Sequence, residues 1–124
     1  MSTQLNCWDK ITEFPPMLIR LLAMKGRGHS ASVMSDEEIA SASGLELADI
    51  QDLSRAESWD GFRIGVARRF LRACGADPAD PKQRHRVIVF FSRETKFHHL
   101  QKNPLWEPRF KPVLLKCLAK KRQT

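Results

Sequence analysis

Residues 35–55, SDEEIASASGLELADIQDLSR, constrain the fold more than any other stretch of the sequence. Ser35 and Glu38 have the S-x-x-E spacing of a capping box, so a helix is expected to begin at this serine. Gly44 is expected to end that helix, because glycine readily adopts the left-handed conformation that closes helices. A second short helix is expected at about residues 46–55, and three of its apolar residues are spaced for burial: Leu47, Ile50 and Leu53. The stretch therefore predicts two short helices joined by a tight turn.

Further helix signals lie on both sides of this pair. Two prolines open the segment EFPPMLIRLLAMKG, where they suit the first turn of a helix, and Gly26 is expected to end it. The small and polar residues of GRGHSASVM then predict a loop. Asp60 is a candidate N-cap for a third helix, which Gly75 is expected to end. The inward face of this third helix is expected to consist of Ile64, Ala67, Phe70 and Leu71.

The last third of the chain is also expected to be helical. Asp80 before Pro81 is an N-cap followed by a proline at the first helical position. The run RVIVFF has the composition of a buried strand, but its apolar spacing continues at three to four residues and no second strand is expected to pair with it. Asn103 and Pro104 are expected to end this helix, and a final helix is expected at about residues 110–120. The predicted fold class is all-α.

Charge is distributed unevenly along the chain, whose formal net charge is +7. Residues 1–35 carry four basic and two acidic side chains, for +2. Residues 36–60 carry one basic and eight acidic, for −7, and residues 61–124 carry sixteen basic and four acidic, for +12. A strongly basic half after an acidic block predicts a polyanion-binding surface that begins after residue 60. A solvated surface with a basic tail is the plainer alternative.

The spacing of the cysteines and histidines and the lack of known catalytic motifs argue against several other classes of protein. The three cysteines (Cys7, Cys74 and Cys117) are widely spaced, so they predict buried residues in a reduced, cytoplasmic protein and not a disulfide framework or a zinc site. His98 and His99 are adjacent, and neighbouring helix positions cannot easily share one metal ion. There is no GxSxG, P-loop or HExxH motif, so neither catalysis nor a cofactor is expected. A signal peptide and a membrane-spanning stretch are not expected either.

The spacing within residues 39–53 is also that of a helix-turn-helix, in which a small residue lies inside the first helix and a glycine forms the turn. Ala40 and Gly44 occupy these positions. Together with VARRFLRACGAD at residues 66–77, the stretch resembles the phage-repressor (Xre/Cro-like) helix-turn-helix family over about residues 36–77. Residues 78–124 lie outside the resemblance, and we expect one domain with three parts. These are an N-terminal helix and linker (1–34), a helix-turn-helix core (35–77) and a basic C-terminal helical extension packed on it (78–124).

The resemblance also implies which side chains would face DNA. In this family the second helix enters the major groove, and its N-terminal residues contact base edges. By position, these residues are Glu46, Leu47, Ala48, Gln51 and Asp52. Such a face can pair an amide with adenine, place apolar groups on thymine methyls and accept from the cytosine amino group through a carboxylate. The helix departs from a usual DNA reader because it has no basic residue before Arg55, and phosphates repel carboxylates.

Two arrangements reconcile the acidic helices with the basic half. In the first, cationic side chains hold the phosphates while the second helix reads bases. These side chains are Arg55, Arg63, Arg68, Arg69, Arg72, Lys82, Arg84 and Arg86. In the second, the acidic pair at residues 36–60 docks a protein partner, and the basic half contacts nucleic acid without sequence preference. A third reading is a binder of single strands or RNA that uses Trp106 and the basic half.

The first arrangement gives the predicted function. We expect a small DNA-binding protein that regulates transcription in the manner of phage or mobile-element regulators, with duplex DNA as its partner. A homodimer is expected from the resemblance, because two half-sites supply affinity that one small module rarely has. The protein is expected in the cytoplasm, on the nucleoid if its host is bacterial. The alternative is a protein-interaction or assembly factor that docks through residues 36–60.

Overall fold

The computed structural model describes residues 13–26, 30–92 and 101–123, of which most lie in helices. The elements in chain order are α2 (Pro16–Ile19), the 3-10 helix η1 (Arg20–Leu22), β1 (Met24–Lys25), β2 (Ser32–Val33), α3 (Asp36–Ser43), α4 (Leu47–Arg55), α5 (Ile64–Ala73), α6 (Pro81–Ser92) and α8 (Phe110–Gln123). The helical class is as predicted, with one small antiparallel sheet of β1 and β2 in addition. Side chains at residues 88–92 and 118–123 are outside the description, as are His98 and His99.

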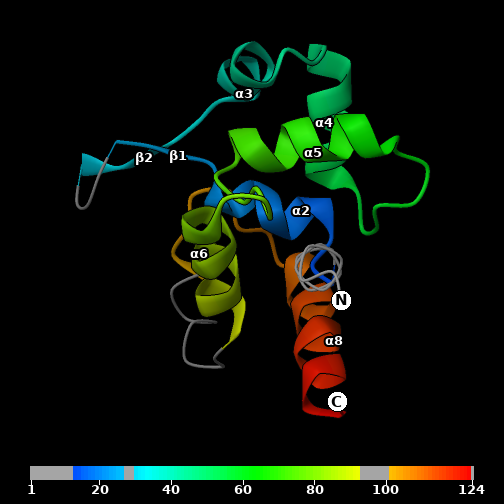
Figure 1. Cartoon of the computed structure of the whole chain (residues 1–124). Helices are drawn as coiled ribbons and strands as arrows, with labels where there is room; N and C mark the ends of the chain where they lie inside the picture. Colours follow the sequence, from blue (N-terminus) through cyan, green and yellow to red (C-terminus); the bar gives the residue numbers. More distant parts are fainter. Residues whose placement is uncertain (1–12, 27–29, 93–100, 124) are drawn as a thin grey trace.

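The segment through α2 and η1 forms the centre of the molecule. Residues 14–23 are all buried, since the segment is apolar on every side except at Arg20. Helices α3, α4 and α5 lie on one side of α2 in Figure 1, and α6 and α8 extend from the other. The hydrophobic cluster around α2 runs from Phe14 to Cys117 and includes residues from each of the three predicted parts. One core therefore joins the parts.

The first helix is shorter than the prolines and Gly26 predicted. It ends as η1 at Leu22, and the chain continues into β1, whose Met24 pairs with Val33 of β2. A longer helix would need the carbonyl groups of residues 21–23 for its own amides. Those carbonyls accept instead from Asn103 Nδ2 (2.9 Å), from Arg86 Nη2 (2.6 Å) and from the backbone amide of Met34 (2.9 Å). Tertiary partners thus replace the last helical turn, and part of the expected loop forms β2.

The predicted helix pair is present between Ser35 and Arg55. The capping box is formed, with Glu38 N donating to Ser35 Oγ (3.1 Å) and Ser35 N donating to Glu38 Oε1 (3.2 Å). Gly44 ends α3 in the left-handed conformation, at φ 74°. Helix α3 packs against both α4 and α5, and α4 also packs on α2. Ile50 and Leu53 are fully buried as expected, whereas Leu47 is 37% exposed because it is the first residue of the helix.

Helix α5 begins one turn later than predicted. Asp60 does not cap it, because residues 57–62 form a turn in which Phe62 N donates to the carbonyl oxygen of Trp59. Trp59 holds this turn on the core: its Nε1 donates to the Phe14 carbonyl (2.8 Å), and its ring meets Phe70 edge-on. The predicted inward residues Ala67, Phe70 and Leu71 are buried. Ile64 was expected inside and is 58% exposed, because it is the first residue of the delayed helix.

The start of α6 follows its local signal. Asp80 Oδ1 accepts from Lys82 N (3.0 Å) before the helix that begins at Pro81. The run RVIVFF lies in this helix, as its spacing predicted. Cys74 and Cys117 are buried free thiols, and burial raises the pKa of Cys74 to about 12. Both are core residues, as predicted.

Candidate nucleic-acid interface

The residues predicted to contact bases share the outward face of α4 and its N-cap. Burial of Ile50 and Leu53 fixes the inward side of the helix. The residues named from the sequence all lie exposed on the remaining surface: Glu46, Leu47, Ala48, Gln51 and Asp52. Glu46 is the N-cap residue but makes no side-chain capping bond, so its carboxylate is not used to close the helix. This face offers two carboxylates, one amide and two apolar side chains, those of Leu47 and Ala48.

A stripe of arginines lies on the outward side of α5. Successive helical residues are rotated by about 100°, so Arg68, Arg69 and Arg72 fall within one arc opposite the buried Ala67, Phe70 and Leu71. All three arginines are exposed. The Nε of Arg72 donates to Asp77 Oδ2 (2.9 Å), yet the arginine side chain stays 75% exposed. We call these three residues the α5 arginine stripe.

The first turn of α5 adds backbone donors beside this stripe. Arg63 is the N-cap residue, it makes no side-chain capping bond, and no acidic residue lies in the first turn. Gly65 follows, exposed, with open space where a Cβ atom would lie. The amides of an uncapped first turn point outward, and the helix dipole favours an anion there. A phosphate approaching the α5 arginine stripe would meet these amides as well.

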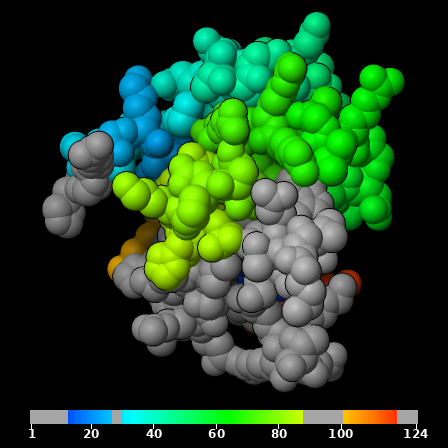
Figure 2. Space-filling model, viewed as in Figure 1, coloured from blue at the N-terminus to red at the C-terminus, as the bar shows by residue number. Residues whose placement is uncertain are grey.

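Helices α3, α4 and α5 form one continuous surface along the top and upper right of Figure 2, in teal to green. The exposed acidic residues and the α5 arginine stripe are therefore on neighbouring elements of the fold. Three charged side chains of this region form ion pairs with partners outside the opposing group. Arg72 pairs with Asp77, Asp36 with Arg20, and Glu38 with Lys25 (3.2 Å).

The basic residues of α6 divide into different environments. Lys82 is exposed and Arg84 is half-buried. Arg86 is exposed as a whole, but its Nη2 donates to the carbonyl of Leu22, and partial burial of its guanidinium lowers its pKa from the usual value. A side chain at Gly75 would collide with this guanidinium, so Gly75 leaves room for it. Arg86 thus ties α6 to η1 through one of its donors, and its contact with phosphate stays a prediction.

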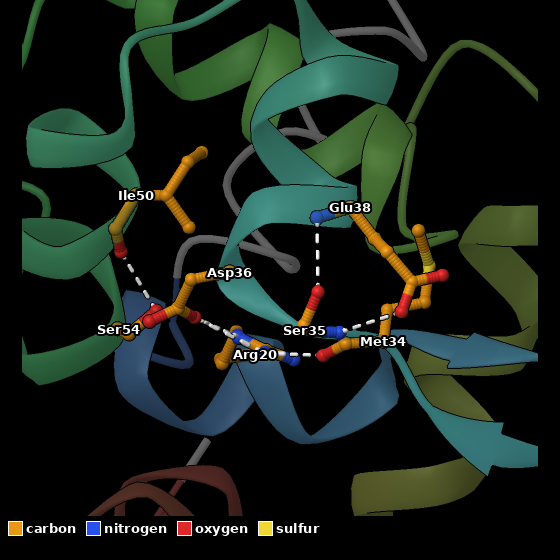
Figure 3. Close-up of polar contacts among 7 residues, drawn as sticks. All are labelled: Arg20, Met34, Ser35, Asp36, Glu38, Ile50 and Ser54. Carbon is orange, nitrogen blue, oxygen red and sulfur yellow. Dashed lines mark hydrogen bonds and ion pairs between the residues drawn. The ribbon is translucent and has the colours of Figure 1, made fainter.

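Arg55 and Arg20 lie near the other end of α4. Arg55, predicted to contact phosphate, is exposed on the last turn of that helix. Arg20 was not singled out from the sequence. Its side chain is only 6% exposed, and it donates to the Asp36 carboxylate through Nε (3.3 Å) and Nη2 (3.1 Å) and to the Met34 carbonyl through Nη2 (2.5 Å). Figure 3 shows that these bonds tie η1 to the start of α3. The only sequence signal was one arginine inside the apolar run PMLIRLLAM.

Comparison of the chain with protein-family models, with curated proteins and with solved structures finds no match. In the part of the chain that the structure describes, no helix has both the length and the apolar character needed to cross a membrane. The case for a function therefore depends on the geometry and charge of α3, α4 and α5.

Proposed function

We propose that this protein binds duplex DNA, with α3, Gly44 and α4 acting as a helix-turn-helix. The observation that carries the proposal is the outward face of α4, where all five predicted base-contacting residues are exposed opposite a fully buried Ile50 and Leu53. A helix placed in the major groove needs such a face, while its other side stays packed on the domain. Gln51 is the side chain best suited to read adenine, and Leu47 and Ala48 suit thymine methyls.

The α5 arginine stripe and the uncapped first turn of α5 supply the phosphate contacts in this proposal. The α4 face carries Glu46 and Asp52, so it adds no electrostatic attraction to DNA and can only discriminate among bases. Affinity then comes from cations outside the groove, and each phosphate that they neutralise makes binding more salt-dependent. Regulation of transcription and pairing of two copies on half-sites extend the same proposal.

A second candidate function is docking of a protein partner on the acidic helices, with the basic half contacting nucleic acid non-specifically. It is favoured by the composition of the exposed surface. Glu37 on α3 and Glu46, Leu47 and Asp52 at α4 are exposed, and the exposed Ile64 lies at the start of α5. A carboxylate-rich surface with apolar residues suits a basic partner better than it suits phosphate.

The experiment is a binding titration with random-sequence duplex DNA at two salt concentrations, with single-stranded DNA in parallel. DNA binding predicts tight duplex association that weakens steeply as salt rises.

A preferred site is then selected from a random pool, and Gln51→Ala and Leu47→Ala should reduce affinity for that site while leaving non-specific binding intact. Unchanged site preference in both variants would favour the protein-docking function. Absence of duplex binding at low salt would remove the proposed function, and preference for single strands would support the reading as a single-strand binder.

A further inference from the structure

A cavity of about 180 Å³ lies between the central α2–η1 segment, the last turn of α4 and residues 105–110. Its residues come from segments far apart in the sequence, including Met17, Ser54 and Phe110. None of the residues predicted to read bases lines it. The cavity is thus at the opposite end of α4 from the N-terminal residues of that helix. An inference about it does not depend on whether the protein binds DNA.

The cavity has an apolar floor and a charged rim. Met17, Leu21 and Phe110 line it and are buried. Arg55, Glu107 and Arg109 also line it and are exposed. A ligand that fits both regions has an apolar body and a charged group. Packing the apolar body on the floor excludes water and favours binding, and the side chains of the rim can bind the charged group.

The lining has a net positive charge. Arg20, Arg55 and Arg109 contribute three positive charges, and Asp36 and Glu107 contribute two negative ones. Arg20 pairs with Asp36 (3.1 Å), and Arg109 Nε pairs with Glu107 Oε2 (2.6 Å). Arg55 forms no ion pair with the described part of the chain. One positive charge on the lining therefore remains without a counter-charge, which favours a monoanion.

Arg20 supplies a second and independent indication of a ligand. Its side chain is more than nine-tenths buried, and its Nη1 atom has no hydrogen-bond partner. The Nε and Nη2 atoms of the same guanidinium are used by Asp36 and Met34 (Figure 3). Buried donors are nearly always satisfied, because an unpaired one retains its full desolvation penalty. Arg20 lines the cavity, but Nη1 is closed to solvent in this structure, so a ligand oxygen completes this guanidinium only when the side chain turns toward the cavity.

We propose that the cavity binds a small organic carboxylate with a compact apolar body, its carboxylate held by Arg20 and Arg55 and its body on Met17, Leu21 and Phe110. The volume sets the size of the ligand. An apolar cavity of about 150 Å³ holds one benzene molecule, so about 180 Å³ suits a single ring with a carboxylate at the rim. Benzoate is therefore the probe, and neutral benzamide is its matched control.

The test is calorimetric titration of the full chain with benzoate, with backbone amide chemical shifts of Ser54 and Arg55 to locate binding. We expect saturable binding with a dissociation constant at or below about 1 mM. Benzamide is expected to bind at least about tenfold more weakly, because it lacks the charge-assisted bonds. No saturation with benzoate, or equal binding of benzamide, would overturn the proposal. So would equal binding of inorganic phosphate, because the cavity would then select charge alone.

Three exposed side chains can be substituted with little effect on folding. The expected change in benzoate affinity differs in direction among the three variants. Arg55→Gln should weaken benzoate binding by about threefold, as expected for a partly solvated ion pair. Glu107→Gln should tighten binding, because it removes a negative charge from the rim and frees Arg109. Lys116→Gln, on α8 and outside the cavity lining, is the matched loss of one positive charge and should leave affinity unchanged. Equal affinities in all three variants would place benzoate elsewhere and refute the assignment.

Discussion

Helices α3 and α5 pack on each other but begin in opposite ways. The first turn of α3 is closed by its own side chains, with a complete capping box and three acidic residues at the positive end of the helix dipole. The first turn of α5 has Arg63 at the N-cap, no capping bond and no acidic residue. The start of α3 is therefore stabilised from within the chain, whereas the amides at the start of α5 are left to water or to an anion.

Under the proposed function, this difference assigns a structural role to the start of α3 and a binding role to the start of α5. The acidic start of α3 is also tied down by Arg20 and Lys25, through Asp36 and Glu38 respectively. Substitutions there are expected to act mainly on the free energy of unfolding. Those at the start of α5 and in its arginine stripe are expected to act mainly on polyanion binding.

The largest expected effect on stability belongs to Arg20, under the start of α3. Arg20→Ala leaves Asp36 and the Met34 carbonyl without their buried donor, so we expect a loss of about 3 kcal/mol in the free energy of unfolding. The measurement is urea denaturation followed by circular dichroism. Arg69→Ala, which removes an exposed arginine of α5, is the control and should change stability by less than about 0.5 kcal/mol. Equal losses would contradict the distinction between the two regions.

The N-caps of the two helices provide the next comparison. Ser35→Ala removes a side chain that accepts from Glu38 N at 3.1 Å and should cost about 1 kcal/mol. Arg63→Ala removes a residue that caps nothing and should be nearly neutral. Both are measured by the same denaturation experiment. If the Arg63 variant lost as much stability as the Ser35 variant, α5 would have a cap that its geometry does not show.

A cap can also be added to α5. Arg63 has the extended backbone of an N-cap, at φ −68° and ψ 145°, so serine can replace it without strain. Arg63→Ser should be more stable than Arg63→Ala by about 0.5–1 kcal/mol, since both remove the charge and only serine caps. The serine should also weaken duplex binding more than the alanine does, because its hydroxyl occupies an amide that phosphate would use. Equal DNA affinities of the two variants would exclude these amides from the phosphate contacts.

The smallest expected effect is the pH dependence of the α3 cap. The backbone hydrogen bond from Ser35, followed by the contact with Lys25, lowers the pKa of Glu38 below its usual 4.5. A lowered pKa in the folded protein stabilises it at pH values above 4.5, and this contribution disappears as the pH falls through the folded value. Urea midpoints of the wild type and Glu38→Gln should therefore differ at pH 7 and converge in acid. A difference that stayed constant with pH would show that ionisation of Glu38 is not involved.

Local signals in the sequence located most helix ends. Long-range contacts explain the helix ends that were predicted wrongly. Ser35, Gly44 and Asp80 act through partners within four residues, so their spacing was sufficient to predict them. The first helix ends early because Asn103 and Arg86, distant in sequence, donate hydrogen bonds to its last carbonyls. No periodicity in the segment itself encodes such contacts. The exact start of α5 was missed for the same reason, since Trp59 is fixed by Phe14.

The candidate interface was predictable in part. The exposed face of α4 follows from helical geometry once Ile50 and Leu53 are placed inside. The environments of the cations do not follow, because they depend on how helices pack. Arg86 is held by a backbone carbonyl and Arg20 lies in the core, whereas the α5 arginine stripe is exposed. The environment of each arginine thus depends on the packing of the helices and not on its local sequence alone.

The most direct test of the central claim is the salt dependence of duplex binding by the wild type and by an Arg68→Ala/Arg69→Ala double variant. The matched control is Lys102→Ala/Lys116→Ala, which removes the same charge from exposed positions outside α3, α4 and α5. If the α5 arginine stripe holds phosphates, the arginine variant binds more weakly and its slope of log affinity against log salt is shallower by about 2, while the control keeps the wild-type slope. Equal slopes in all three proteins would contradict the account.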